Sequence, residues 1–432
     1  MICNNLSVSA DGRLLFAGQD AAALLKEYGS PLYLFDENKI RENCRTYYIA
    51  MKEAFGEKAL PLYASKAASF KEMYRIVCSE GLGIDVVSAG EIYTAKMAGA
   101  DLGLAYFHSN NKTDEDIAFA IENGIGCFVV DNVEELYAID RIAGQKGLRQ
   151  AVLLRLTPGI DTHTYEAVNT GKVDSKFGTA IETGQAMEIT KVALSLPHLE
   201  LQGFHCHVGS QVFDSDTFIR SAEIMLNFMA ETEKSLGYTA QVLDLGGGYG
   251  VRYLESDPEI DIAANIHQVA DYVKKTCTAL GLELPAIRME PGRSIVADAG
   301  MTLYTVGTIK QIPGYKNYVS VDGGMSDNPR FALYGSAYTV VAAEKMKEPA
   351  TFECSVVGRC CESGDIIQEN VKLPASIQRG DVLAVLTTGA YNYSMASNYN
   401  RIARLPVVML KDGTARLAVR RESLDDLIRN DL

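Results

Sequence analysis

The chain has 432 residues, of which 47% are hydrophobic and 22% charged, and its formal net charge is −14. This length exceeds one ordinary hydrophobic core, so we expect two domains of a soluble globular enzyme or binding protein. The acidic balance argues against nucleic acid or an anionic membrane as a partner, because no basic tract is present to displace counterions.

The chain shows no signal for export. Met1–Asn5 is not a basic segment followed by an apolar one, and no run of about 18 apolar residues occurs. Nine cysteines without CxxC or Cys/His spacing favour a reducing compartment over a disulfide framework. We therefore expect a cytoplasmic protein that neither spans nor binds a membrane.

The first 35 residues predict a small N-terminal arm. Residues 6–16 are expected to form a hairpin that turns at Asp11 and Gly12, since Asp-Gly between extended runs is a good hairpin signal. A short helix over 21–27 and a strand over 32–35 follow. The alternating strands that follow in the sequence do not need this arm, so we expect it to join a sheet elsewhere in the protein.

From Asp36, which resembles a helix cap, strands and helices alternate. Strands are predicted near 60–65, 83–87, 104–108, 127–131, 151–156, 201–207, 241–245 and 286–290. Helical periodicity precedes them over 37–54 and follows them in segments such as 89–98, 113–123, 132–145 and 214–235. Eight strands alternating with helices over about 250 residues predict a (β/α)8 barrel with its site at the strand C-termini. A doubly wound open sheet is the alternative.

From about residue 301 the pattern changes to short β-rich runs punctuated by Gly and Pro. These runs cover 302–311, 317–322, 335–342, 351–358, 382–387, 404–410 and 415–420. They predict an antiparallel β-sandwich or barrel. We therefore divide the chain into a barrel domain, 36–295, and a β-rich domain that combines 1–35 with 296–432.

One lysine stands out at the end of the first barrel strand. The apolar run from Leu60 to Ala64 ends at Ser65 and Lys66. Such a lysine either extends its ammonium into water or does chemistry. A partly desolvated lysine can lose its proton and form an imine with an aldehyde cofactor.

Two further strand ends carry groups that suit an anionic cofactor. Three consecutive glycines from Gly246 follow the seventh strand, and their backbone N–H groups can converge on a phosphate, although a glycine turn alone is often only a turn. Glu290 and Arg293 follow the eighth strand. They are either an ordinary loop ion pair or a carboxylate for a pyridine nitrogen beside an arginine for anionic groups.

Two histidines and a serine end the sixth strand. His205 and His207 have a spacing that can suggest a metal, but no carboxylate or cysteine completes a set at the usual spacing, so we expect no metal. One imidazole stacked on a flat ring, with the Ser210 hydroxyl donating to phosphate, is the favoured interpretation.

A turn in the β-rich domain contains Cys360, Cys361, Glu362 and Asp365. Vicinal cysteines seldom bond to each other, and a buried cysteine is usually inert packing. A thiol in a polar turn beside two carboxylates is instead a candidate proton donor.

Together these stretches resemble the fold-type III pyridoxal-phosphate-dependent decarboxylases, from about Pro31 to Ile402. Three departures from the family pattern are Phe331 where proline is common, the second thiol of Cys360, and Asn392 in place of a usual glycine. The motifs that carry the resemblance are YASK (63–66), DVVSAGE (85–91), HTYEAVNTGKVDSKFG (163–178), HCHVGSQ (205–211), LDLGGGYG (243–250), EPGR (290–293), DNPRFALYG (327–335), CESGD (361–365) and GAYNYSMASNYN (389–400).

The resemblance implies a role for each matching position. Lys66 would hold pyridoxal 5'-phosphate, His207 would stack on its ring, and Glu290 would bind the ring nitrogen. Cys361 would be the proton donor, with Asp85 and Arg155 as supporting groups. The implied phosphate contacts are Ser210, Gly247, Gly248, Gly292, Arg293 and Tyr391. The implied substrate contacts are Arg293, Arg330, Tyr334, Glu362 and Tyr391.

The implied reaction removes the carboxylate at the D-configured end of meso-2,6-diaminopimelate, giving L-lysine and CO2. Arg330 and Glu362 complement the carboxylate and ammonium at the far end of this substrate. The implied assembly is a homodimer in which Cys361 and Glu362 reach the partner's barrel. The alternatives are a decarboxylase for carboxynorspermidine, arginine or ornithine, and a non-catalytic regulator that has lost the cofactor.

Overall fold

The computed structural model describes residues 2–160 and 175–432. The chain forms two compact units. The barrel unit comprises Asn43–Gly250 and Glu259–Ser294, and the β unit comprises Met1–Glu42, Val251–Pro258 and Ile295–Leu432. Residues 163–174, most of the HTYEAVNTGKVDSKFG motif, lie outside the described residues.

Eight parallel strands close into a barrel in the barrel unit. They are β5 (Leu60–Ala64), β6 (Gly83–Val86), β7 (Ala105–Phe107), β8 (Cys127–Val130), β9 (Gln150–Thr157), β11 (Leu199–His205), β12 (Val242–Asp244) and β13 (Ala286–Met289). Consecutive strands are neighbours, and the first and last strands pair with Arg288 opposite Leu60. The short strand β10 (Thr179–Ala180) pairs with β9. The predicted (β/α)8 barrel is confirmed, and the open sheet is wrong because the eight strands leave no free edge.

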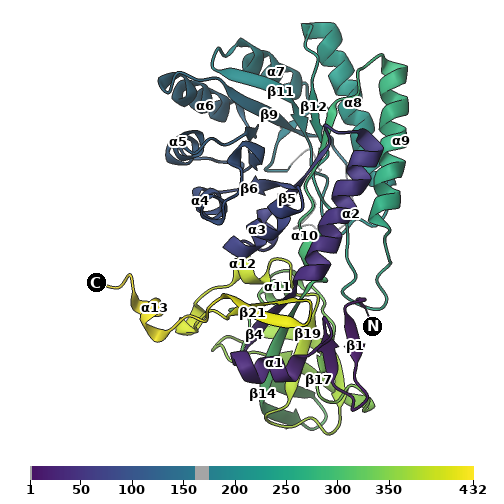
Figure 1. The fold of residues 1–432 in the computed structure, drawn as a ribbon, viewed down its shortest axis with the longest axis vertical. Coiled ribbons are helices and arrows are strands. Elements are labelled where there is room, and N and C mark those ends of the chain that lie inside the picture. Colours follow the sequence, from purple (N-terminus) through teal and green to yellow (C-terminus); the bar gives the residue numbers. More distant parts are fainter. Residues whose placement is uncertain (1, 161–174) are drawn as a thin grey trace. The chain divides into compact units, whose positions relative to one another are not determined.

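Helices follow the barrel strands and lie outside them, as Figure 1 shows for α4 to α7. Their bounds are α3 (Lys71–Ser79), α4 (Ala89–Ala98), α5 (Asp114–Glu122), α6 (Val133–Gln145), α7 (Gln185–Ser195), α8 (Asp216–Leu236), α9 (Ile262–Leu280) and α10 (Arg293–Val296). Helix α2 (Glu37–Phe55) begins in the β unit and continues into the barrel unit. The barrel unit also contains the 3-10 turns η1 (Ser65–Ala67) and η2 (Leu102–Leu104).

Local signals explain where these helices begin and what fills the barrel. The Ser88 side chain caps α4 by accepting from the Glu91 N–H, and Glu91 Oε2 accepts from the Val87 N–H at 2.7 Å, so part of DVVSAGE serves capping. Inside the barrel, apolar side chains from five strands pack in one cluster of Leu62, Tyr106, Cys127, Val129, Leu153 and Val242. This core supports the polar residues at the strand ends.

The β unit contains two sheets. The predicted hairpin is confirmed: β1 (Leu6–Val8) pairs with β2 (Leu14–Phe16), and β3 (Gln19–Asp20) completes a three-stranded sheet before α1 (Ala21–Tyr28). The larger sheet takes in β4 from the arm. Its strands are β4 (Leu32–Asp36), β14 (Gly300–Ile312), β15 (Lys316–Val321), β16 (Val340–Ala342), β17 (Ala350–Val357), β18 (Ile366–Pro374), β19 (Val382–Leu386), β20 (Val407–Lys411) and β21 (Thr414–Val419).

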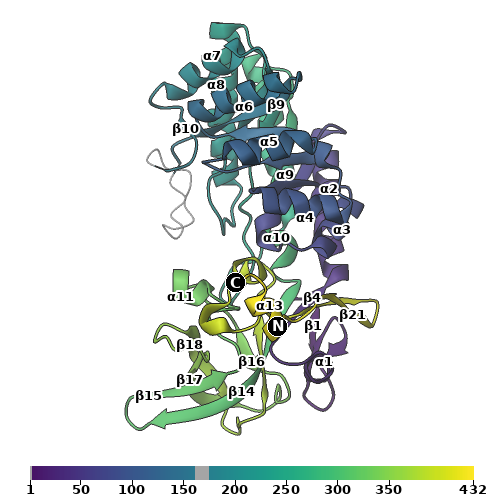
Figure 2. The same cartoon turned by 90° about the vertical axis from the view of Figure 1, so that its left-hand side faces the viewer.

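The larger sheet is mostly antiparallel, but β15 pairs with β17 and β4 with β20 in parallel. Figure 2 shows β14 and β15 as a long hairpin in this sheet. The sequence analysis missed β18 and the short helix α11 (Arg330–Tyr334), which occupies the residues just before the predicted 335–342 run. The unit also contains α12 (Asn392–Met395), η4 (Tyr399–Arg401) and α13 (Leu424–Ile428).

The N-terminal arm shares a core with the larger sheet. Phe16 and Leu24 pack in one cluster with Leu34, Leu303 and Leu410. These side chains are 5% exposed or less, which explains why the arm needs the C-terminal strands to bury its apolar face.

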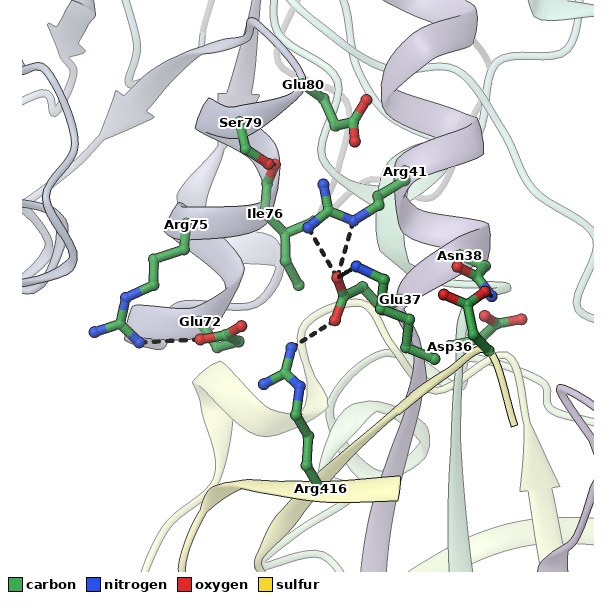
Figure 3. A network of polar contacts seen from close by, with 12 residues as sticks. Asp36, Glu37, Asn38, Arg41, Glu72, Arg75, Ile76, Ser79, Glu80 and Arg416 are labelled. Carbon is green, nitrogen blue, oxygen red and sulfur yellow. Dashed lines mark hydrogen bonds and ion pairs between the residues drawn. The ribbon is translucent and has the colours of Figure 1, made fainter. Parts of the chain in front are cut away.

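A buried carboxylate ties the start of α2 to the last two strands of the β unit (Figure 3). Glu37 accepts from Arg41 Nε at 2.9 Å, Lys411 Nζ at 3.0 Å and Arg416 Nη2 at 2.5 Å. Burial would raise the pKa of Glu37, but these three cations outweigh it and lower the pKa. The carboxylate therefore stays charged, and losing it would leave three cations without their shared partner.

Val251–Pro258 belongs to the β unit, although the sequence analysis placed it in the barrel domain. The Tyr253 carbonyl accepts from Thr339 Oγ1 at 2.7 Å, and the Tyr253 and Tyr338 rings meet edge to face at 5.3 Å. These contacts hold the segment that connects β12 to α9 against the β unit.

All nine cysteines are free thiols. No helix among the described residues is both long and apolar enough to span a membrane.

Candidate active site

The polar residues of the barrel unit gather where the parallel strands end. Lys66 follows β5, Asp85 lies in β6, His108 follows β7 and Glu290 follows β13. Because the carboxyl ends of parallel strands meet at one edge of a barrel, residues far apart in the sequence share this edge.

Lys66 is the exposed lysine of this edge. It lies in η1 and is exposed, whereas its neighbours Ser65 and Ala67 are buried. The positive charge of Lys66 opposes the rise that burial causes in the pKa values of the Asp85 and Glu91 carboxyl groups. The prediction that this lysine ends a buried strand is therefore met, and its amine is accessible to a reactant.

Two imidazoles approach the buried Glu290 carboxylate. His205 Nε2 lies 3.3 Å from Glu290 Oε2 in hydrogen-bond geometry. His108 Nε2 lies 2.7 Å from Oε1, at ion-pair distance although the two atoms are not aligned as a hydrogen bond. Burial alone would raise the pKa of Glu290, but the two histidines outweigh burial and hold that pKa well below its usual range.

Two more carboxyl groups face the same space and behave differently. Burial raises the pKa of Asp85 to about 6. Burial, with the Glu290 charge adding to it, raises the pKa of Asp244 well above its usual range, while Asp244 Oδ1 accepts from the Gly246 N–H at 2.8 Å. Glu290 is therefore the carboxylate that stays ionised in this cluster.

The glycine turn after β12 lies against the EPGR segment and against the segment that follows β11. A Cβ on Gly247 would lie 2.1 Å from the Glu290 carbonyl oxygen, and one on Gly248, whose φ is +131°, would lie 2.5 Å from the Gly209 carbonyl oxygen. Only glycine permits these approaches. Gly292 is similarly confined, since its Cβ would meet the Ala64 side chain at 2.9 Å.

This turn brings an arginine and a hydroxyl together. Arg293 donates to Ser210 Oγ from Nη2 at 2.9 Å and from Nε at 3.2 Å. Arg293 is only 6% exposed. A buried guanidinium, a hydroxyl and a glycine turn form a set that suits a phosphate.

His207 is a neutral imidazole. Its Nδ1 accepts from the Gly247 N–H at 3.2 Å, so that nitrogen is unprotonated. Burial lowers the pKa of His207 well below its usual range, and the charges of Lys66 and Arg155 lower it further. A flat, neutral ring suits stacking on a cofactor ring. Arg155 itself lies 4.5 Å from the centre of the Phe177 ring.

His108, His205 and Glu290 also form a group that could ligate a metal. One ligand atom of each lies within 4.8 Å of the others, and all three residues are buried. The sequence analysis considered only the pair His205 and His207, and the group instead uses a histidine and a carboxylate from other strands. Two arrangements suit these three residues. Either they ligate a metal ion, or the two imidazoles contact the Glu290 carboxylate directly.

In the β unit, three of the predicted substrate contacts meet. The Arg330 guanidinium lies 4.7 Å from the centre of the Tyr391 ring and 5.1 Å from that of Tyr334. Arg330 is 6% exposed, and its Nε has no hydrogen-bond partner within the described residues. The Tyr391 backbone has φ of +70°, a strained value for a non-glycine residue.

The CESGD turn lies in the same unit and presents two of its predicted site residues to solvent. Cys361 and Glu362 are exposed, whereas Asp365 is buried. Asp365 accepts from the Met325 N–H at 2.6 Å and the Cys360 N–H at 2.7 Å. Asp365 therefore fixes the turn from which Cys361 projects.

Backbone contacts join the remaining motifs of the β unit to this turn. The Cys361 N–H donates to Asn400 Oδ1 at 2.8 Å, and the Ser397 N–H donates to the Ser326 carbonyl at 2.8 Å. DNPRFALYG, CESGD and GAYNYSMASNYN are thus neighbours in space. Within the β unit, Arg330, Tyr334 and Tyr391 form one group, and Cys361 and Glu362 lie on an exposed turn.

Cys360 differs from its neighbour. Burial raises the pKa of Cys360 to about 11, and the Asp365 charge adds to this effect. The thiol of Cys360 is therefore protonated and interacts with Asp365, and Cys361 is the more exposed of the two cysteines.

Sequence reasoning missed His108 and the structural role of Asp365. His108 could have been found by the rule that singled out Lys66, since it stands directly after a buried strand. Its contact with Glu290 joins residues that are distant in the sequence and has no local signal.

Comparisons with known proteins agree with this arrangement. Residues 38–297 match the family model of the pyridoxal-dependent decarboxylase, pyridoxal binding domain. The chain is 44% identical over 421 residues to diaminopimelate decarboxylase of Bacillus subtilis (strain 168), covering 98% of this chain and 95% of that protein. It is 45% identical over 421 residues to diaminopimelate decarboxylase of Staphylococcus aureus (strain COL), covering 98% of each.

Among solved structures, diaminopimelate decarboxylase from M. jannaschii in complex with L-lysine has a TM-score of 0.91 and 33% sequence identity, covering 100% of this chain and 98% of that one. The predicted family is confirmed by relatives that match almost the whole chain. The chain belongs to the diaminopimelate decarboxylase family of pyridoxal-dependent decarboxylases.

Proposed function

We propose that the protein holds pyridoxal 5'-phosphate at the strand ends of its barrel and removes the carboxylate at the D-configured end of meso-2,6-diaminopimelate. The products are L-lysine and CO2. The observation that carries this proposal is the meeting of an accessible lysine, an ionised buried carboxylate and a glycine turn at one barrel edge, in a chain of this family.

The residues at this edge fit the cofactor. Ser210, Gly247, Gly248, Gly292 and Arg293 would hold the phosphate, with Tyr391 as a further contact. The fit rests on the donors of Arg293 and Ser210 beside a turn that has no room for a Cβ. Lys66 would bind the aldehyde carbon, and Glu290 would hold a proton on the ring nitrogen.

When bound, pyridoxal phosphate supplies an aldehyde that captures the substrate's amino group and a protonated ring that withdraws the electrons left by CO2. Lys66 would hold the cofactor through its aldehyde carbon. An ionised Glu290 would hold a proton on the ring nitrogen, and the protonated ring would be the electron sink that decarboxylation needs. An arginine at this position, as in a racemase, would weaken that sink. His207 would offer a neutral face to the cofactor ring. Asp85 and Arg155 would be supporting groups around Lys66 and His207.

Substrate choice follows from the β unit residues. Arg330, between two tyrosine rings, can make a bidentate pair with the far carboxylate of diaminopimelate, and Glu362 complements its far ammonium. Tyr334, Tyr391 and Arg293 complete the contacts. Ornithine or L-lysine would leave Arg330 without its anionic partner. The M. jannaschii relative was solved in complex with L-lysine, which supports this substrate class.

Cys361 is proposed as the proton donor to the carbon that loses CO2, because its side chain is exposed, whereas Cys360 is partly buried and interacts with Asp365. We propose that the chain works as a homodimer, with Cys361 and Glu362 of one copy serving Lys66 of the other. A cytoplasmic location is consistent with nine free thiols.

A spectroscopic experiment tests the cofactor. The purified protein should be yellow, should bleach on treatment with borohydride, and should then carry the reduced cofactor on the peptide that contains Lys66. The matched control is Lys71→Ala, a change in the first turn of α3 that should leave the label in place. Colourless protein that takes up no added cofactor would favour the non-catalytic regulator instead.

A mixing experiment tests the shared site. Lys66→Ala and Cys361→Ala homodimers should each be nearly inactive. Reassembly in equal amounts should give half heterodimers, each with one intact site, so roughly a quarter of the wild-type activity should return. No recovery after verified subunit exchange would rule out a site shared between copies.

A further inference from the structure

We propose that His108 and His205 are positioning residues for Glu290. Each imidazole places its Nε2 beside one oxygen of the carboxylate, which holds Glu290 turned toward the ring nitrogen of the cofactor. The inference rests on the proposed function, since that function assigns Glu290 to the ring nitrogen.

The geometry places one imidazole at each oxygen. His108 Nε2 lies 2.7 Å from Oε1 and His205 Nε2 lies 3.3 Å from Oε2. The two rings are 5.0 Å apart at 70°, so they approach the carboxylate from different directions. All three side chains are at most 8% exposed. Because a carboxylate has about four acceptor positions, two remain for the cofactor.

The protonation states follow from the surroundings. His205 Nδ1 is buried without a hydrogen-bond partner among the described residues, and burial lowers the pKa of His205, so the ring is neutral with its proton on Nε2. His108 Nε2 lies between two carboxylates, 2.7 Å from Glu290 and 3.8 Å from Asp85 Oδ1. An imidazole nitrogen that faces only acceptors must carry a proton.

Other titratable or charged groups around Glu290 come from six further positions: Lys66, Asp85, Arg155, Cys206, His207 and Asp244. Burial and the Glu290 charge raise the pKa of Asp244 well above its usual range. The nitrogens of His108 and His205 lie 2.7 Å and 3.3 Å from the two Glu290 oxygens, so these imidazoles are placed to orient the carboxylate, with the Asp244 carboxyl as a further hydrogen-bonding neighbour.

The first experiment measures the affinity for pyridoxal phosphate in variants of the full chain. The variants are His108→Leu and His205→Leu, which remove the donor, and His108→Gln and His205→Gln, which keep an N–H near the same place. The control is His267→Leu, a half-exposed histidine on α9 that lies 3.6 Å from Glu53. Apoprotein is titrated with pyridoxal phosphate, and the visible absorption of the bound form is recorded.

Each leucine variant should bind pyridoxal phosphate about ten- to a hundredfold more weakly, because Glu290 loses one of its two imidazole contacts. The glutamine variants should recover most of this loss, and the control should match the wild type. If the wild type itself binds no pyridoxal phosphate, the proposed function fails. If it binds and both leucine variants bind equally well, the positioning role is wrong.

The second experiment uses the pH profile. Without an imidazole donor the pKa of Glu290 rises, so the carboxylate is protonated on mild acidification and kcat should fall at a higher pH than in the wild type. KM for the substrate should stay within about twofold, because the substrate contacts lie elsewhere. Unchanged acid limbs in both leucine variants would overturn the proposal.

The metal alternative is separated by direct analysis. Purified wild-type protein, as holoenzyme and apoprotein, should contain far less than one transition-metal ion per chain, and a chelator should not change the affinity for pyridoxal phosphate. One tightly bound ion per chain that disappears in His108→Leu would assign these residues to metal ligation and overturn the positioning role.

Discussion

Replacing Asp365 with asparagine should both destabilise the β unit and slow the reaction. The carboxylate receives two backbone N–H groups, from Met325 at 2.6 Å and from Cys360 at 2.7 Å, one on each oxygen. The side chain cannot turn away, because Gly324 and Gly358 leave no space beside it: a Cβ on either would lie 2.6 Å or less from a carboxylate oxygen.

The magnitude follows from these two bonds. An asparagine keeps one acceptor oxygen and directs its NH2 group at the other backbone N–H, so one buried donor loses its partner. A hydrogen bond to a charged group contributes about 1.5–3 kcal/mol, and the unpaired donor adds to the loss. We expect the free energy of unfolding to fall by about 2–4 kcal/mol.

Urea unfolding followed by circular dichroism measures the stability, since the chain has no tryptophan. The matched control is Asp271→Asn, an exposed carboxylate on α9. We also expect kcat to fall more than about tenfold, because Cys361 is displaced, while the visible absorption of the bound cofactor stays unchanged. Wild-type stability together with wild-type kcat would refute the assignment of Asp365 as the residue that fixes this turn.

Three further outcomes are expected. Lys66→Ala should abolish turnover while circular dichroism remains that of the wild type, and appreciable activity with bound cofactor would show that another lysine is used. Arg330→Ala should raise KM for meso-diaminopimelate by an amount that corresponds to about 2–3 kcal/mol, and it should narrow the preference of the enzyme for meso-diaminopimelate over L-lysine. An unchanged preference between these two substrates would remove Arg330 from the specificity site. Burial raises the pKa of Asp327 to about 7, above that of the unfolded chain, so its contribution to stability should decline as pH rises from about 4 to 7. The urea midpoint of Asp327→Asn should therefore fall less over this window than that of the wild type, and equal slopes would contradict this.

The barrel was predictable because its signals are local. Each barrel strand is a short apolar run, and helices such as α4 begin at side chains that cap them, as Ser88 does. Glycines at strand exits and a lysine at the end of an apolar run indicated the cofactor end of the barrel. The match of separate motifs to one family then fixed the role expected for each residue.

The features that the sequence did not predict depend on tertiary contacts. Strand β18 was missed because a polar stretch, Gln368 to Asn370, interrupts its alternation, and Asn370 has φ of +55° where the pairing shifts register. Residues 251–258 were placed with the barrel because they connect two of its elements, yet the contacts of Tyr253 are with Tyr338 and Thr339. His108 was missed because its partner Glu290 lies in a distant segment of the chain.

The central claim is the choice of substrate. The most direct test measures CO2 release by the purified protein, supplied with pyridoxal phosphate, from meso-diaminopimelate, its LL isomer, ornithine, arginine and carboxynorspermidine. We predict that the meso isomer is consumed with L-lysine as the product and that the others react at least about a hundredfold more slowly in kcat/KM, since each lacks the D-configured reacting centre or the far carboxylate and ammonium together. Faster release of CO2 from ornithine, arginine or carboxynorspermidine than from meso-diaminopimelate would contradict the account.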